Sequence, residues 1–154
     1  MDTEETRNKV YQKAQALFNE GITDSSLIQK TGKVEIPIAI HEPGGDIEAW
    51  LVGVVARDKL VGYMRFKDDL ELLGYSSFQR QKDSIDECPD AKTWLDPESV
   101  LKRANSVAQP GDHLEQPVLS YDQHPDRIAW AVRATGEKGE DKLIYVAGEF
   151  VYLK

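Results

Sequence analysis

Two stretches, "DIEAWLVGVV" (46–55) and "DRIAWAVRAT" (126–135), carry the strongest structural signal in this sequence. Each begins with Asp, has Ala-Trp at its fourth and fifth positions, and continues into a run rich in apolar and β-branched residues. Such runs are typical of β-strands. The similarity predicts one structural unit that is present twice in the chain.

The similarity extends on both sides of these stretches. Pro37 precedes Trp50 by thirteen residues, and Pro117 precedes Trp130 by the same number. Further along, Asp-Lys-Leu occurs at 58–60 and again at 141–143, with three extra residues before the second copy. Strands draw on a small set of residue types, so chance similarity is the alternative explanation. The shared spacing and the shared order of elements favour an internal repeat.

The pattern of apolar residues predicts the elements of each copy. A helix over 3–20 has Val10, Ala14, Leu17 and Phe18 on one face. A second helix over 96–111 begins with Asp96 as its cap and Pro97 in its first turn, and it buries Val100, Leu101, Ala104, Val107 and Ala108. The predicted strands lie at 33–43, 47–56, 60–66, 70–78, 116–121, 127–135 and 141–154, and the last divides near Ala147-Gly148. Pro37 cannot donate to a strand ladder, so its strand is expected at a sheet edge.

These elements predict an α+β fold made of two tandem units, each a helix followed by an antiparallel meander. The repeat units span about 3–78 and 96–154, and 79–95 connects them within a single domain, 1–154. One short helix cannot cover the apolar face of a whole sheet. We therefore expect the two units to form a continuous sheet covered by two helices.

The composition excludes some classes of partner. The chain has 154 residues, 40% of them hydrophobic, and a formal net charge of −8. Such a chain can bury a core, but it would be repelled by nucleic acid and by an anionic membrane surface. No apolar run approaches the length of a membrane span, so membrane insertion is not expected. The charged N-terminus has no signal-peptide pattern, and the compartment stays open: cytoplasmic, or secreted or periplasmic if a signal segment has been removed.

The second half of the chain resembles a known family. "TWLDPESVLKRANSVAQPG" (93–111), followed by "PVLSYDQHPDRIAWAVRA" (117–134), is similar to the helix-and-meander unit of PepSY domains and of the propeptide domains of thermolysin-like and streptopain-like proteases. The matching positions are Pro117, Leu119, Tyr121, Arg127, Ile128, Ala129, Trp130 and Val132. The first half is similar in outline. No peptidase domain follows in this chain, and the resemblance implies a cystatin-like α+β unit that binds or inhibits rather than catalyses.

The sequence contains no recognised catalytic or cofactor motif, so we predict no catalytic residue and no cofactor. The single cysteine, Cys88, is the one candidate nucleophile. Its neighbours Asp86, Glu87 and Asp90 are acidic and would raise the pKa of the thiol, which disfavours catalysis. An inert thiol in a linker is the simpler interpretation. Measuring the rate of thiol modification would separate the two.

Alternating Asp122, His124 and Asp126 in "DQHPDR" could ligate a divalent ion. A polar hairpin turn explains the same residues, so no metal site is predicted there. His41 and Glu42 end a strand before the turn "PGGD", and we interpret them as a solvated pair. If His41 and His124 clustered with acidic side chains, the chain would be a ligand-binding accessory protein.

Taken together, these observations predict a non-catalytic binding module with a protein partner, acting as a peptidase modulator or inhibitor or as another protein-binding domain. The alternative is a small-molecule or metal-binding accessory protein. Trp50 and Trp130 hold equivalent repeat positions, which suits the core. Trp94 lies before the second helix, as a hydrophobic-staple residue or a surface anchor, and it is the predicted partner-binding residue. The identity of the partner and the oligomeric state stay open.

Overall fold

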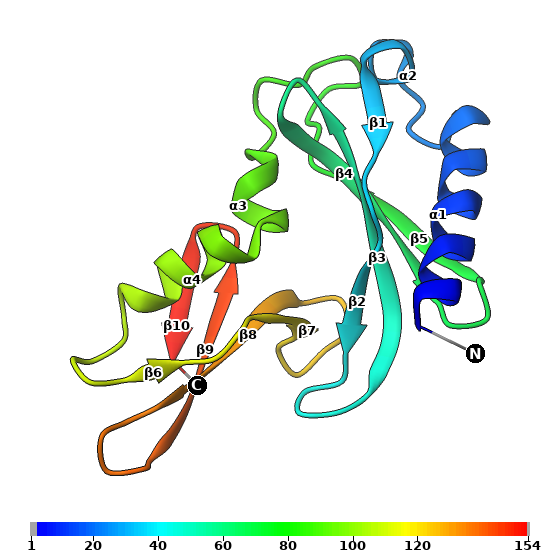
Figure 1. The fold of residues 1–154 in the computed structure, drawn as a ribbon. Coiled ribbons are helices and arrows are strands. Elements are labelled where there is room, and N and C mark those ends of the chain that lie inside the picture. Colours follow the sequence, from blue (N-terminus) through cyan, green and yellow to red (C-terminus); the bar gives the residue numbers. More distant parts are fainter. Residues whose placement is uncertain (1–2, 154) are drawn as a thin grey trace. The chain divides into compact units, whose positions relative to one another are not determined.

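The computed structural model describes residues 3–153 and has an α+β fold with two antiparallel sheets (Figure 1). The chain divides into two compact units. Unit 1 comprises the residues up to Ala39 and Ile47–Ala91, and unit 2 comprises Ile40–Asp46 and the residues from Lys92 onward. Each unit has its own sheet and its own helices, and each is described by itself below.

Unit 1 contains a long helix, a short helix and most of the first sheet. Its elements are α1 (Thr3–Asn19), α2 (Ser26–Thr31), β1 (Gly32–Val34), β2 (Ile38–His41, of which Ile40 and His41 are assigned to unit 2), β3 (Ile47–Ala56), β4 (Lys59–Lys67) and β5 (Leu72–Ser77). The strand order is β1-β3-β4-β5, and β2 also pairs with β3. The predicted strand over 33–43 is therefore divided in two beside Pro37. Both pieces lie at the edge of the sheet, as a proline without an N–H requires.

The core of unit 1 lies between α1 and one face of β3. Val10 and Ala14 of α1 are fully buried against a cluster that includes Trp50 and Val52. The indole N–H of Trp50 donates to Asp68 Oδ1 at 3.2 Å, so its polar group has a partner. Burial of these side chains, rather than local helix propensity, holds α1 on the sheet.

Unit 2 contains the second pair of helices and the second sheet. Its elements are α3 (Ala91–Leu95, of which Ala91 is assigned to unit 1), α4 (Pro97–Asn105), β6 (His113–Leu114), β7 (Val118–Tyr121), β8 (Ile128–Thr135), β9 (Asp141–Ala147) and β10 (Phe150–Leu153). The strand order is β10-β9-β8-β6, and β7 also pairs with β8. As predicted, the last strand divides at Gly148, which adopts a positive φ of 61°.

The core of unit 2 is built in the same way. Val100 and Ala104 of α4 are fully buried, and α4 packs against β8 and β9 (Figure 1). Trp130 and Val132 of β8 are buried as well. The indole N–H of Trp130 donates to the carbonyl of Trp94 at 2.7 Å. Even-numbered residues of β8 therefore face the helices, and odd-numbered residues face the opposite side.

The pairing of strands follows the same pattern in both sheets. In the first, Val34 pairs with Val54, and the N–H of Glu35 donates to the carbonyl of Gly53. Eighty positions later, Leu114 pairs with Ala134, and the N–H of Glu115 donates to the carbonyl of Arg133. Trp50 and Trp130 are also eighty positions apart, in β3 and β8.

The structure corrects one part of the sequence comparison. Leu60 pairs with Val55, and Asp141 pairs with Thr135, the residue eighty positions after Val55. By register the counterpart of Leu60 is thus Asp141 and not Leu143, so the equivalence of the two Asp-Lys-Leu tripeptides is wrong. A bulge in the β3–β4 pairing and turns of different length shift the register there.

Three further expectations are wrong. The sheets are two separate five-stranded sheets rather than a continuous one, because the strands that flank β3 and β8 come from the same sequence half. The helix predicted over 96–111 begins as expected, with Asp96 as its cap, but ends at Asn105, and Val107 and Ala108 lie beyond it. The segment 91–95, predicted as part of the connection 79–95, is the helix α3, and α2 over 26–31 was not among the predicted helices.

Candidate functional site

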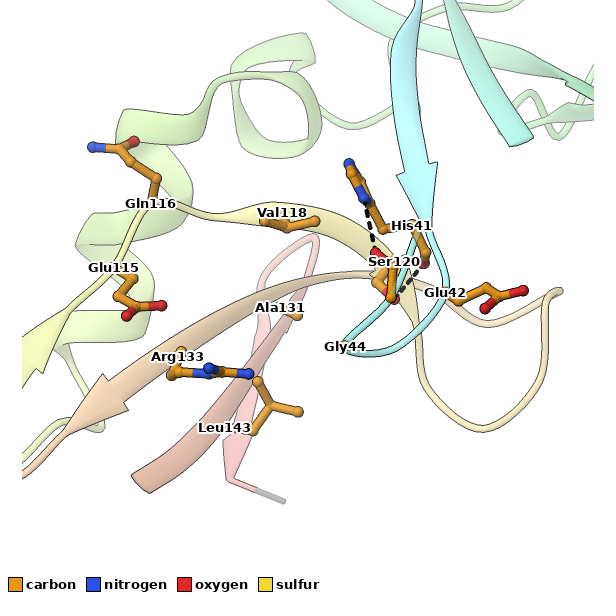
Figure 2. Close-up of a pocket in the computed structure, with 11 residues that line it drawn as sticks. His41, Glu42, Gly44, Glu115, Gln116, Val118, Ser120, Ala131, Arg133 and Leu143 are labelled. Carbon is orange, nitrogen blue, oxygen red and sulfur yellow. Dashed lines mark hydrogen bonds between the residues drawn. The ribbon is translucent and has the colours of Figure 1, made fainter. Parts of the chain in front are cut away.

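A cavity of about 290 Å³ lies on the face of the second sheet that carries the odd-numbered residues of β8. All of its lining belongs to unit 2. It is open to solvent, since several lining residues are exposed. Its lining consists of His41, Glu42, Gly44, Gly45, Glu115, Gln116, Val118, Ser120, Ala131, Arg133 and Leu143 (Figure 2).

The floor of the cavity is apolar and comes from three neighbouring strands. Val118 of β7 pairs with Ala131 of β8, and Leu143 of β9 pairs with Arg133 of β8. Val118, which is 40% exposed, leaves apolar surface in contact with solvent. The small side chain of Ala131 leaves room between its neighbours. The alternation of the strands thus places a patch of apolar surface on the side away from α4.

The charged side chains of the cavity are not paired with one another. The guanidinium of Arg133 is exposed and has no hydrogen bond or ion pair within residues 3–153. The carboxylates of Glu42 and Glu115 are exposed and likewise have no side-chain partner in the part of the chain that the structure describes. The cavity therefore offers one cation and two anions to a ligand. Figure 2 shows Arg133 beside Leu143, next to the apolar floor.

The turn after β2 forms one wall of the cavity. It is braced internally, because the N–H of Gly45 donates to the carbonyl of Glu42 at 2.8 Å and His41 Nδ1 lies 3.3 Å from the carbonyl oxygen of Gly45. The hydroxyl of Ser120 donates to the carbonyl of His41 at 2.8 Å (Figure 2). This wall is therefore fixed to β7.

The structure places the predicted partner-binding residue, Trp94, in α3. Its side chain is half-buried, and its carbonyl accepts the indole N–H of Trp130. A Cβ at Gly148 would lie 3.0 Å from Cε2 and Cζ2 of Trp94, so the ring covers the β9–β10 turn. Trp94 does not line the cavity. The partner-binding role of Trp94 stays a prediction. A partner would contact only the part of the Trp94 ring that the β9–β10 turn leaves exposed.

The three residues considered for a metal site differ in their exposure to solvent. Asp122 is buried, and its carboxylate accepts the hydroxyl of Tyr152 at 2.7 Å. His124 and Asp126 are exposed in the turn, where the N–H of Asp126 lies 3.3 Å from His124 Nδ1. Among the described residues, no group of three His, Cys, Asp or Glu side chains is placed to hold a metal ion. His124 is not among the residues that line the cavity, whereas His41 is.

Cys88 is part of the core of unit 1. Its side chain is 3% exposed. Burial raises the pKa of the Cys88 thiol, the carboxylate of Glu87 raises it further, and Lys59 partly offsets both. A buried thiol with a raised pKa is a poor nucleophile at neutral pH.

Sequence reasoning did not identify Arg133 and Ala131, which line the cavity, as candidate site residues. Both residues lie within 126–135, the second of the two similar stretches, and a comparison of the two stretches contains a signal for them. Aligned on the two tryptophans, Ala131 stands where the first copy has Leu51, and Arg133 stands where it has Gly53. The replacement of a leucine by a smaller residue, next to the replacement of a glycine by a charged one, indicates that this face of β8 differs from that of β3.

Comparisons with protein-family models, with curated proteins and with solved structures find no match for this chain. None of the helices within residues 3–153 is long and apolar enough to span a membrane.

Proposed function

We propose that this chain is a non-catalytic binding module that recognises a protein partner through the cavity of unit 2. The observation that carries the proposal is the combination of an exposed apolar floor with unpaired charged side chains on one sheet face. Exposed apolar surface beside convergent polar groups is typical of binding sites. Within this proposal a peptidase modulator is one kind of partner-binding domain, and Trp94 remains a second candidate contact.

The scaffold is proposed to be a tandem repeat of helix-plus-meander units, similar in design to PepSY-like and cystatin-like domains. The shared strand order and the pairing offset of eighty residues support a duplication. A duplicated scaffold can keep its core in both copies and change an outer face in one of them. In this chain the changed face is the one with the cavity.

Burial of Cys88 supports a non-catalytic function, because the thiol was the candidate nucleophile of the sequence. A small-molecule-binding protein is the second candidate. The observation that favours it is the size of the cavity, about 290 Å³, close to the lower end of the range for small-ligand pockets.

The test is a selection of peptides on the immobilised full chain from a random library, followed by titration of the selected peptides. Ala131→Leu introduces the residue found at the equivalent position of unit 1 and fills the cavity. Thr135→Leu is the matched control, because Thr135 lies on the same strand and the same face but outside the lining. We expect Ala131→Leu to weaken binding by at least about tenfold, which corresponds to 1.4 kcal/mol.

Thermal unfolding of both variants shows whether they keep the fold. Enrichment of no peptide, or equal binding by wild type and Ala131→Leu, would contradict the proposal. Retained binding by Thr135→Leu together with loss in Ala131→Leu would support it. Saturable binding of small molecules without any peptide would favour the second candidate.

A further inference from the structure

We infer that the cavity of unit 2 binds the C-terminal carboxylate of a peptide whose last residue is apolar, with Arg133 as the residue that receives the carboxylate. This inference rests on the proposed function, because it names the ligand chemistry of the same cavity. It follows from the state of Arg133, the position of the apolar floor and the charges at the rim.

The guanidinium of Arg133 is the group that would bind the carboxylate. A guanidinium presents a planar set of N–H donors that matches a carboxylate with two parallel hydrogen bonds. In many proteins such a group is paired with a carboxylate of the same chain. Here two glutamates line the same cavity, and neither forms an ion pair with Arg133. Its donors are therefore available to a ligand.

The position of the apolar floor selects among carboxylate ligands. Leu143 is the direct cross-strand partner of Arg133, and Ala131 is two residues away on the same strand face. Neighbouring strands lie about 4.8 Å apart, so the guanidinium and the floor are within reach of a single residue. A C-terminal apolar residue carries a carboxylate and an apolar side chain on the same Cα. An aspartate or glutamate uses its side chain for the charge and leaves the floor uncovered.

The rim determines the rest of the ligand. Glu42 and Glu115 are exposed and negative, so a ligand with several negative charges, such as a phosphate ester, would be repelled. They would attract a basic residue located before the C-terminus. The formal net charge of −8 adds a long-range attraction for a basic partner. Because the cavity is open, the remainder of the peptide can continue outward into solvent.

The experiment uses hexapeptides labelled with fluorescein at the N-terminus, with random internal residues and a C-terminal leucine. The same pool is prepared as the free acid and as the C-terminal amide, and binding to the full chain is measured by fluorescence polarisation. We expect the acid to bind about ten- to a hundredfold more tightly than the amide, as expected for a hydrogen bond to a charged group. Pools with a lysine before the leucine should bind more tightly than pools with a glutamate there.

Arg133→Gln should remove the preference for the acid, and Arg133→Lys should keep part of it, because the charge remains without the planar pair of donors. Arg127→Gln is the control, since Arg127 is exposed in the same unit but does not line the cavity. Equal binding of acid and amide that is still lost in Ala131→Leu would overturn this inference and leave the proposed function intact. Binding of neither pool would overturn this inference, and the proposed function would fall with it only if the random library also yields no peptide.

Discussion

The two sheets have the same strand order and differ in what one face of the central strand carries. On the face toward the helices, equivalent positions hold similar residues. Trp50 corresponds to Trp130, and Val52 corresponds to Val132. All four side chains are at most 3% exposed. This face forms the core in each unit.

The opposite face differs between the units. In β3 every residue from Ala49 to Ala56 is buried. In β8 the residue equivalent to Leu51 is Ala131, which is half-buried, and the residue equivalent to Gly53 is Arg133, which is exposed. Of the positions compared on β3 and β8, those that are alike are buried in the core, and two that differ, Ala131 and Arg133, line the cavity. The function that we propose therefore depends on the face on which β8 differs from β3.

The largest effect is expected from the equivalent tryptophans. Trp50→Ala and Trp130→Ala each remove a large buried aromatic side chain, and each should lower the free energy of unfolding by about 3–5 kcal/mol. Urea unfolding followed by far-ultraviolet circular dichroism measures both without depending on tryptophan fluorescence. Trp94→Ala should cost less, because that side chain is only half-buried. If Trp94→Ala is the most destabilising of the three, the comparison of the two tryptophan sites is wrong.

The next effect tests the faces that differ. Gly53→Arg introduces the residue of unit 2 into unit 1, where it places a charge at a buried position, and the expected cost is about 3 kcal/mol or more. Arg133→Gly makes the reverse change at an exposed position. This change should lower the free energy of unfolding by about 0.5–1 kcal/mol, the cost of a glycine within a strand. Urea unfolding of both variants gives the two costs, and similar values would show that the two faces do not differ as described.

Much of this scaffold could be predicted from the sequence. The strand predicted over 47–56 is β3, because ten residues dominated by apolar side chains suit a strand buried on both faces. Asp96 and Pro97 identify the start of α4 correctly. The short helix α2 was missed, since six residues with two apolar side chains give no clear period. The signal that could have revealed it is Ser25, whose hydroxyl accepts the N–H of Ile28 as a cap.

The candidate site could be predicted much less well. Arg133 and Leu143 are neighbours because of cross-strand register, and register depends on turn lengths that the tripeptide comparison misjudged. His41 enters the lining through a hydrogen bond between its carbonyl and Ser120, seventy-nine positions later. Contacts between distant backbone and side-chain atoms leave no local pattern in a sequence. The pattern of apolar residues thus predicts cores better than cavities.

A smaller effect concerns the turn between β9 and β10. Gly148→Ala combines a positive φ of 61° with a contact of 3.0 Å to the Trp94 ring. Gly139→Ala is its matched control, since Gly139 has a φ of 82° and open space around it. Backbone strain should cost about 1–2 kcal/mol in both, and the crowded ring should add about 1 kcal/mol at Gly148. In a Trp94→Ala background the added cost should vanish, and equal costs in the wild-type background would argue against this packing.

The smallest effect is a difference between two tyrosines at high pH, one in each unit. Burial raises the pKa of Tyr75 to about 12, with a further contribution from Cys88. Burial also raises the pKa of Tyr152 to about 12, and the hydrogen bond to Asp122 adds to the increase. For both tyrosines, the pKa in the folded state lies above the ordinary value of 10.0. Their stabilising contribution is therefore complete below pH 10 and is lost as the pH rises toward 12.

Asp122→Asn should lower the pKa of Tyr152 without returning it to 10.0, because burial remains, and should leave the pKa of Tyr75 unchanged. Absorbance at the tyrosinate band, measured in Tyr75→Phe and Tyr152→Phe backgrounds, assigns each titration to its tyrosine. If both tyrosines titrate in Asp122→Asn as they do in wild type, the contact with Asp122 does not hold Tyr152 in its neutral form.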